Sequence, residues 1–251
     1  KKDKKKINNK KIKAIYFDNY NQLDKKLKKI KVEIVIHCAT HYIKDHKTKD
    51  ITKFAASNIL FGNIILDNLK KMETKKFINF STVWEDYNGI KNNNINLYSV
   101  YKKAHALLID YYKKILPKIF FYEIMLSETF GINDRRQKLI NVLKNNYELN
   151  KTTKINSRNL SVNLLNVKDI MNAIQLIIKG NVKPKKYVLK NNFSFKISYL
   201  INLFNKKNAK KIRVKWMTNK IIKEKIFGYE TLKRWKPKHS KIEDIFNIIK
   251  K

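Results

Sequence analysis

Residues 77–103 read FINFSTVWEDYNGIKNNNINLYSVYKK, and this stretch decides the fold. Its apolar start predicts a short strand that ends in the hydroxyl pair Ser81 and Thr82. Tyr98 and Lys102 are four residues apart, so on a helix they lie on one face, one turn from each other. A nearby ammonium lowers the pKa of a phenol because it stabilises the phenolate. The stretch therefore predicts a general acid or base, Tyr98, beside a hydroxyl that holds a substrate oxygen.

The flanking sequence places this stretch in an alternating α/β pattern. Residues 34–39 read as a buried strand, residues 96–116 have apolar side chains at helical spacing, and residues 118–125 form another apolar run. Alternating strands and helices predict a parallel sheet, in which ligands bind beyond the carboxyl ends of the strands. This context matters, because a chain with 13 Tyr and abundant Lys also produces Tyr-x-x-x-Lys in ordinary amphipathic helices.

With these elements in order, the chain resembles the extended short-chain dehydrogenase/reductases, the NAD-dependent epimerase/dehydratase family of nucleotide-sugar enzymes. Tyr98 and Lys102 match the catalytic pair of that family, and Thr82 matches its catalytic hydroxyl, with Ser81 as the alternative. Further ordered matches are residues 58–63 (a helix after the fourth strand), 128–134 (the loop after the sixth strand), 163–170 (a Val-x-Asp segment), 235–237 (a Trp-x-Pro turn) and 242–245 (a closing helix).

The resemblance implies an α/β fold, with a Rossmann-like doubly wound parallel sheet in residues 1–133 and a smaller substrate-binding lobe, interleaved with the sheet, in residues 134–251. In this second part the pattern predicts helices at residues 139–149, 169–178, 195–204 and 218–227, and strands at 163–167, 186–189 and 211–216.

The resemblance also implies NAD or NADP as cofactor. Lys102 would hydrogen-bond the nicotinamide ribose and lower the pKa of Tyr98, and Ala39 and Thr40 would face the cofactor. Asn63 is assigned to the cofactor as well, with packing between helices as an equal alternative.

Residues 82–88, TVWEDYN, resemble the branch of sugar 4-reductases that contains CDP-abequose and CDP-paratose synthases. This branch implies reduction of the 4-keto group of a 6-deoxy nucleotide sugar, with Trp84 at the substrate. Arg135 and Arg136, together with Lys138, could clamp the substrate pyrophosphate, because arginine pairs bidentately with phosphates. The start of a solvated helix is an equal alternative for these cations.

The phosphate-binding turn of the family is not found in this sequence. Its glycines are Gly62, Gly89, Gly131, Gly180 and Gly228, and their spacing does not form G-x-G-x-x-G. Residues 12–18 resemble the third strand of the family, and there is no initiator Met, so we expect a fragment truncated at the N-terminus. We then expect either that residues 12–17 pair with the free edge of the strand at 34–39, or that the chain is poorly stable.

Composition bounds the remaining possibilities. The 251 residues, 43% of them hydrophobic and 12% aromatic, suffice for one large domain, or for a core with a small lobe. A net charge of +37 would normally indicate nucleic acid or an anionic membrane. The excess is mostly Lys spread along the chain, as an AT-rich genome would produce, so we expect no specific nucleic-acid partner. A noncatalytic basic binding protein, or a degenerate relative without cofactor, is the alternative to the enzyme.

Three further properties can be considered from the sequence: the location of the protein, metal binding and assembly. No apolar run approaches the roughly 20 residues of a membrane helix, no signal peptide begins the chain, and Cys38 is the single cysteine. We therefore expect a soluble cytoplasmic protein without a membrane partner. The family resemblance implies a possible homodimer, paired through the helix that carries Tyr98. His37, Cys38, His41 and His46 are possible zinc ligands, but no second ligand pair follows them, so we expect no metal.

Overall fold

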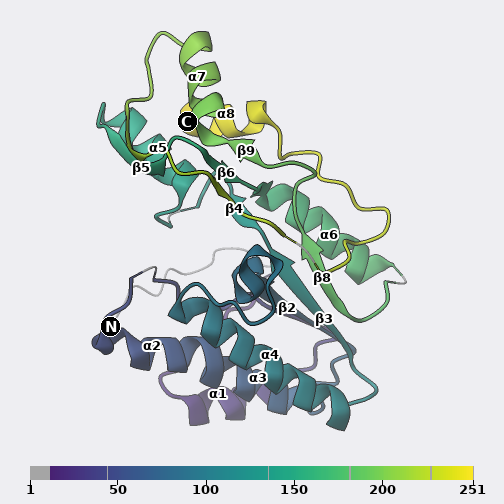
Figure 1. Ribbon diagram of the computed structural model, residues 1–251. Helices are drawn as coiled ribbons and strands as arrows, with labels where there is room; N and C mark the ends of the chain where they lie inside the picture. The colour runs from purple at the N-terminus through teal and green to yellow at the C-terminus, as the bar shows by residue number, and fades with distance from the viewer. Residues whose placement is uncertain (1–11, 44, 135, 181, 227, 251) are drawn as a thin grey trace.

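The computed structural model describes residues 12–43, 45–134, 136–180, 182–226 and 228–250. Within them, four parallel strands form the main sheet in the order β1-β2-β3-β8. These strands are β1 (Ile34–His37), β2 (Lys76–Thr82), β3 (Phe120–Leu126) and β8 (Lys186–Leu189). Figure 1 shows helices on both sides of this sheet. The expected α/β class and Rossmann-like sheet are confirmed.

Helices cover both faces of the sheet, and alternate side chains of β2 reach both layers. Phe77 packs in a buried cluster with residues of α1 (Tyr20–Leu27), α3 (Phe61–Asn68) and α4 (Leu97–Ile115). Ile78 packs in a second cluster, with α6 (Val167–Lys179). Strands covered on both faces need apolar side chains at successive positions, which explains the short apolar run that the sequence shows here.

The second half of the chain builds a separate cluster above the sheet (Figure 1). Its helices are α5 (Leu139–Glu148), α7 (Ile197–Lys207) and α8 (Ile242–Lys250). Its strands are β5 (Thr153–Ser157), β6 (Leu160–Val162), β9 (Phe195–Lys196), β10 (Val214–Thr218) and β11 (Ile222–Lys223). The short pair β4 (Glu128–Phe130) and β7 (Leu164–Asn166) leads from the sheet to this lobe. Because β8 returns to the main sheet, the two parts are interleaved.

The carboxylate of Asp169 fixes the closing turn of the chain to the start of α6. It accepts hydrogen bonds from the backbone amides of Lys238 and His239 and from the hydroxyl of Ser240. Trp235 Nε1 donates to the Asp169 carbonyl at 3.0 Å. The Val-x-Asp segment and the Trp-x-Pro turn, 66 residues apart in sequence, therefore form one structural unit.

The strand expected at residues 12–18 is absent, because the described residues 12–17 are irregular and do not pair with β1. Phe17 stacks instead on Phe61 of α3, with ring centroids 6.0 Å apart. A strand forms only where its backbone can hydrogen-bond to a neighbouring strand. An apolar side chain such as Phe17 needs only an apolar surface to pack against, and here the helix layer provides that surface. Among the described residues β1 is an edge strand, with Ile36 41% exposed. The poor stability expected as the alternative stays a prediction.

The helix expected at residues 218–227 is also wrong. The chain there ends β10, turns, and forms β11, which pairs in parallel with β6. The backbone amide of Ile222 donates to the Asn159 carbonyl at 3.3 Å, so pairing with a distant strand overrides the local apolar spacing. The helices expected at 139–149, 169–178 and 195–204, and the strands at 163–167 and 186–189, agree with α5, α6, α7, β7 and β8 to within a few residues.

None of the helices in the described parts of the chain combines the length and the apolar character that crossing a bilayer requires.

Candidate functional site

A pocket of about 190 Å³ opens at the carboxyl ends of β2 and β3, next to the loop that follows β1. It lies where ligands bind in open parallel sheets. Its lining residues are Thr40, Tyr42, Ser81, Thr82, Trp84, Tyr98, Leu126, Ser127, Glu128, Thr129, Arg136 and Lys138. We call it the catalytic pocket.

Tyr98 lies in the first turn of α4 and lines this pocket. Asn96 caps the helix, since its side chain accepts a hydrogen bond from the Ser99 amide at 2.9 Å. The Ser99 hydroxyl in turn donates to the Asn96 carbonyl at 2.8 Å. The cap fixes the first helical turn, and Tyr98 therefore lies at a defined position beside the ends of the strands.

The Tyr98 phenol is enclosed by the loop after β1. It forms a hydrogen bond with the Thr40 hydroxyl, and the ring of Tyr42 meets its ring edge-on at 5.1 Å between centroids. Burial raises the pKa of Tyr98 well above its ordinary value, and the charge of Glu85 raises it further. The net pKa of Tyr98 is therefore raised rather than lowered, because desolvation of the phenolate outweighs the effect of nearby positive charge.

Lys102 lies one helical turn below Tyr98, as the spacing predicts. Its Nζ is 6.0 Å from the centroid of the Tyr98 ring and donates a hydrogen bond to the Phe80 carbonyl at 2.8 Å. The side chain is only 4% exposed, and burial lowers the pKa of Lys102 to about 8. An ammonium has three hydrogens, so this single contact leaves two for a ligand.

Ser81 and Thr82 both line the catalytic pocket. Thr82 Oγ1 accepts a hydrogen bond from the Trp84 amide at 3.3 Å and so caps the 3-10 segment Val83–Gly89. Ser81 Oγ is buried without a hydrogen-bond partner in the described part of the chain. Since a buried hydroxyl is normally paired, Ser81 is available to a bound polar group.

The loop that carries Ala39 and Thr40 is held by Asn58. Asn58 lies in a π-helical turn (Ala56–Leu60) between α2 (Ile51–Ala55) and α3. Its side chain accepts from the His41 amide at 2.6 Å and donates to the His41 carbonyl at 3.0 Å. Such π-turns are frequent at functional sites.

A second, shallower groove of about 410 Å³ lies next to this loop. Its lining residues are Tyr20, Ala39, His41, Lys53, Ala56, Ser57 and Phe61. Thus Ala39 lines the groove and Thr40 lines the catalytic pocket, whereas Asn63, on α3, lines neither.

Two cations border the catalytic pocket. Arg136 donates through Nε to Asp134 at 2.7 Å and through Nη2 to Thr129 at 3.1 Å. Lys138 pairs with Glu128 at 3.2 Å. Arg135, which the sequence assigned to the same task, lies outside the described residues.

Some residues at the pocket were given no site role from the sequence: the lining residues Tyr42, Leu126, Ser127, Glu128 and Thr129, and Glu224, which contacts the lining residue Trp84. Tyr42 lies two residues after Thr40, and Glu128 is the first residue of the matched segment 128–134, so a closer reading of those segments would have found them. Glu224 gives no local signal, since it comes from the segment wrongly expected to be helical. It hydrogen-bonds Trp84, and burial together with the charge of Glu128 raises the pKa of Glu224 to about 7.

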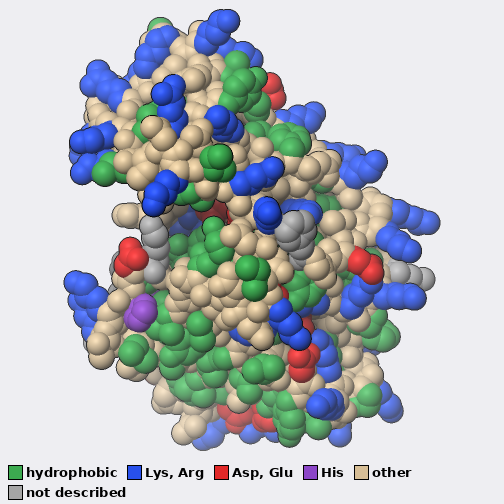
Figure 2. Space-filling view, in the orientation of Figure 1, with side chains coloured by type: hydrophobic (Ala, Val, Ile, Leu, Met, Phe, Trp, Pro, Cys, Tyr) green, Lys and Arg blue, Asp and Glu red, His purple; other side chains and the backbone are tan. Residues whose placement is uncertain are grey.

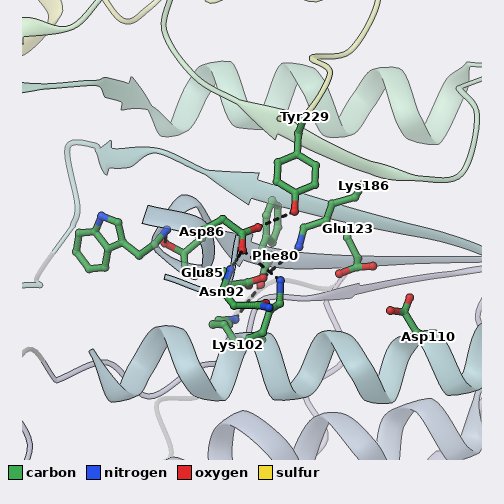
Figure 3. Close-up of polar contacts among 12 residues, drawn as sticks. Phe80, Glu85, Asp86, Asn92, Lys102, Asp110, Glu123, Lys186 and Tyr229 are labelled. Atoms are coloured by element: carbon green, nitrogen blue, oxygen red, sulfur yellow. Dashed lines mark hydrogen bonds and ion pairs between the residues drawn. The ribbon is translucent and has the colours of Figure 1, made fainter. Parts of the chain in front are cut away.

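Buried charges lie beneath the pocket (Figure 3). Glu85 is fully buried and pairs with Lys186 of β8 at 3.1 Å. Glu123 of β3 pairs with Lys113 of α4 at 2.7 Å. Burial raises the pKa of Glu85, and its charge favours the protonated forms of both Lys102 and Tyr98. These pairs join segments up to 101 residues apart in sequence.

Two buried histidines lie behind the pocket, between the sheet and α4. His37 Nδ1 is 2.9 Å from Asn79 Oδ1, and the His37 and His105 rings are 4.9 Å apart. His105 packs directly against Gly62, whose missing side chain makes room for the ring. Burial lowers the pKa of His37 to about 4 and that of His105 to about 3. Among the described residues, no group of three or more His, Cys, Asp or Glu side chains could hold a metal ion.

Comparison with known proteins finds a matching family model and two curated relatives. A sequence model of the NAD dependent epimerase/dehydratase family matches residues 1–189. CDP-abequose synthase of Yersinia pseudotuberculosis is 28% identical over 170 residues, covering 64% of this chain and 56% of that protein. dTDP-D-glucose 4,6-dehydratase of Dictyostelium discoideum is 30% identical over 210 residues, covering 68% of this chain and 46% of that protein. The chain thus spans about half the length of these curated relatives.

Solved structures share the fold at low identity. UDP-glucuronic acid 4-epimerase from Bacillus cereus, in complex with UDP-glucuronic acid and NAD, superposes with a TM-score of 0.76 at 17% identity, covering 93% of this chain and 80% of that one. dTDP-glucose 4,6-dehydratase from Bacillus anthracis, in complex with NAD, gives a TM-score of 0.72 at 16% identity, covering 92% and 76%.

Proposed function

Because the chain belongs to the NAD-dependent epimerase/dehydratase family, we propose that it forms the catalytic part of an NAD(P)-dependent nucleotide-sugar oxidoreductase. Its reaction is reduction of the 4-keto group of a 6-deoxy nucleotide sugar. The likeness to CDP-abequose synthase supports this choice within the family.

The buried, protonated phenol of Tyr98 carries the proposal. Its raised pKa keeps Tyr98 neutral near pH 7, so Tyr98 is poised to donate a proton. Reduction of a ketone requires a proton at the oxygen, whereas oxidation of an alcohol requires a base. Tyr98 lines the pocket beside Ser81 and Thr82 and is protonated at neutral pH, so it is placed to supply that proton.

The other pocket residues divide the remaining tasks. NADH or NADPH, when bound, supplies the hydride. Thr82 and the unpartnered Ser81 hydroxyl hold the keto oxygen next to the Tyr98 phenol. As Tyr98 gives up its proton, the Lys102 ammonium stabilises the phenolate that remains.

The residues present fit the nicotinamide end of the cofactor. Two hydrogens of the Lys102 ammonium remain for ribose hydroxyls. Ala39 presents only a methyl group to the neighbouring groove, so a flat ring can approach β1 closely. Asn63 lines neither cavity, which favours its packing role.

The size of the catalytic pocket agrees with a sugar ring rather than a whole nucleotide sugar. Its volume of about 190 Å³ is below the roughly 300–1,000 Å³ of sites that enclose a drug-sized ligand. Trp84 forms one wall for the sugar, and Arg136 and Lys138 are placed to meet the diphosphate.

We also propose that the protein forms a homodimer through α4. Large apolar side chains recur along its outer face, and Leu107 is 66% exposed. The other members of this exposed face are Val100, Tyr111 and Ile115.

The function is tested by following oxidation of NADH and of NADPH with a CDP-4-keto-6-deoxyhexose as substrate. Tyr98→Phe should lower kcat by about 10²–10⁴-fold, the usual contribution of a general acid. Tyr101→Phe is the matched control, because Tyr101 is a helix neighbour that stacks on Phe54. Turnover that survives Tyr98→Phe would contradict the proposed role, and binding of either cofactor by calorimetry without turnover would contradict the proposed substrate.

A further inference from the structure

The outer face of the β5–β10 pair carries only positive charges. Along β5 and β10 alternate side chains point outward, and the outward charged residues are Lys154, Arg158, Arg213 and Lys215. The inward residues Ile155 and Trp216 belong to the apolar cluster of the lobe or pack against it. We call Lys154, Arg158, Arg213 and Lys215 the cationic face.

The arrangement of these charges costs stability in the free protein. Lys154 lies directly beside Lys215 in the ladder, and like charges at paired positions repel. The nearest carboxylates along the chain are Glu148, which pairs with Lys144, and the half-buried Glu224. An anionic partner would remove this repulsion.

A general bias toward lysine does not explain the pattern. Residues 150–223 contain 18 Lys and Arg but a single carboxylate, Asp169, which is buried and holds the closing turn. Residues 1–149 contain 15 Asp and Glu, so the shortage of acids is specific to the segment from β5 to β11, which also includes α6 and β8 of the main sheet. The whole chain has only five arginines, and two of them lie on the cationic face. Figure 2 shows Lys and Arg gathered over the lobe that carries α5, α7 and β5.

An apolar tip adjoins the cationic face. Ile221, in the turn between β10 and β11, is 84% exposed, more than any other large apolar side chain in the described residues, and Met217 is 55% exposed. The turn is tied to the end of β5: the Arg158 amide donates to the Thr218 carbonyl at 3.0 Å, and the Asn159 side chain donates to the Asn219 carbonyl at 2.7 Å. The tip is therefore held next to Arg158.

We propose that the cationic face and the apolar tip bind the surface of an anionic membrane. Basic side chains are attracted to anionic headgroups, and exposed aliphatic side chains gain by entering the boundary between headgroups and acyl chains. Nucleic acid fits less well, because single strands are bound by stacking bases on aromatic rings, whereas the exposed apolar side chains beside the cationic face, Met217 and Ile221, are aliphatic and Trp216 packs against the lobe's core. The surface is separate from the catalytic pocket, so the enzyme would work while attached.

The test is sedimentation of the whole chain with vesicles of phosphatidylcholine, with and without phosphatidylglycerol. We expect binding only to the vesicles that contain phosphatidylglycerol. Lys154→Glu/Lys215→Glu should weaken it by about tenfold or more, and Met217→Ser/Ile221→Ser several-fold at unchanged net charge. The control Lys70→Glu/Lys71→Glu makes the same charge change at exposed lysines outside the cationic face and the α4 face, and should have less than about a twofold effect.

Two results would overturn the proposal. If the control weakens binding as much as the variant on the cationic face, attraction by total charge is sufficient and no dedicated surface exists. If a fluorescent oligonucleotide binds more tightly than the vesicles, depends on Lys154 and Lys215, and ignores Met217→Ser/Ile221→Ser, the surface serves nucleic acid. All substituted positions are exposed, and circular dichroism of each variant verifies that the fold is kept.

Discussion

Lys102 is the residue whose protonation controls the proposed reduction. Burial lowers its pKa to about 8, so it is charged at neutral pH and loses its proton only slightly above it. The neutral amine cannot stabilise the Tyr98 phenolate. We therefore expect kcat to fall as the pH rises through about 8. Lys102→Met should retain only slow activity, and the kcat of this variant should not fall in that pH range. A wild-type profile that stays flat up to pH 10 would contradict this assignment.

The buried imidazoles of His37 and His105 make a separate prediction about stability in acid. Their pKa values are lowered to about 4 and about 3 in the folded state, against 6.5 for the free side chain. The unfolded chain thus binds more protons below pH 6.5, and the free energy of unfolding falls as the pH drops from 6.5 towards 4. By linkage the loss at pH 5 is about 2 kcal/mol for each imidazole.

Urea unfolding at pH 7 and pH 5 measures this loss. His105→Leu should show roughly half the decrease of the wild type, whereas substitution of the exposed His46 should leave the decrease unchanged. Equal decreases in wild type and His105→Leu would show that carboxylates, rather than these imidazoles, control the acid response.

At the scale of elements, the contact between α3 and α4 depends on one glycine. A Cβ at position 62 would lie 2.3 Å from His105 Nε2, closer than atoms can approach. Gly62→Ala should therefore destabilise the protein by about 1–3 kcal/mol, although alanine is the better helix former. His105→Ala alone leaves a cavity, but Gly62→Ala/His105→Ala fills part of it. The double variant should be more stable than the sum of the single changes predicts, as thermal unfolding of all four proteins will show.

The elements also show where sequence reasoning succeeds and where it fails. The strands at 34–39, 77–80 and 186–189 are short apolar runs, and the central strand β2 is buried on both faces, so local composition is sufficient to predict them. The prediction for 218–227 fails because pairing with the distant strand β6 decides its conformation, and that for 12–18 fails because the segment packs on α3 instead of pairing with β1. The sequence does not show which elements are neighbours. The same limit applies to the site: the Tyr98 and Lys102 spacing is local, whereas the Glu85 and Lys186 pair joins residues 101 apart.

At the scale of the whole molecule, the exposed face of α4 supports the proposed dimer. Val100, Leu107, Tyr111 and Ile115 recur at steps of seven, four and four residues, so they form one apolar stripe on the side of the helix away from the sheet. A stripe of this kind is costly in water and is typical of a protein–protein interface. Because α4 also carries Tyr98 and Lys102, two α4 helices packed together would hold both catalytic pockets rigid.

We therefore expect the chain to sediment as a dimer and Leu107→Lys/Tyr111→Lys to sediment as a monomer in analytical ultracentrifugation. Ile90→Lys is the control, since Ile90 is also strongly exposed but lies in the loop before α4. If Leu107→Lys/Tyr111→Lys still dimerises, the interface lies on another part of the protein. If the monomeric variant keeps its fold but its kcat falls, α4 needs the partner helix to position Tyr98, and dimerisation is required for catalysis. If it keeps kcat, the cap at Asn96 is sufficient to position the phenol, and dimerisation serves stability alone.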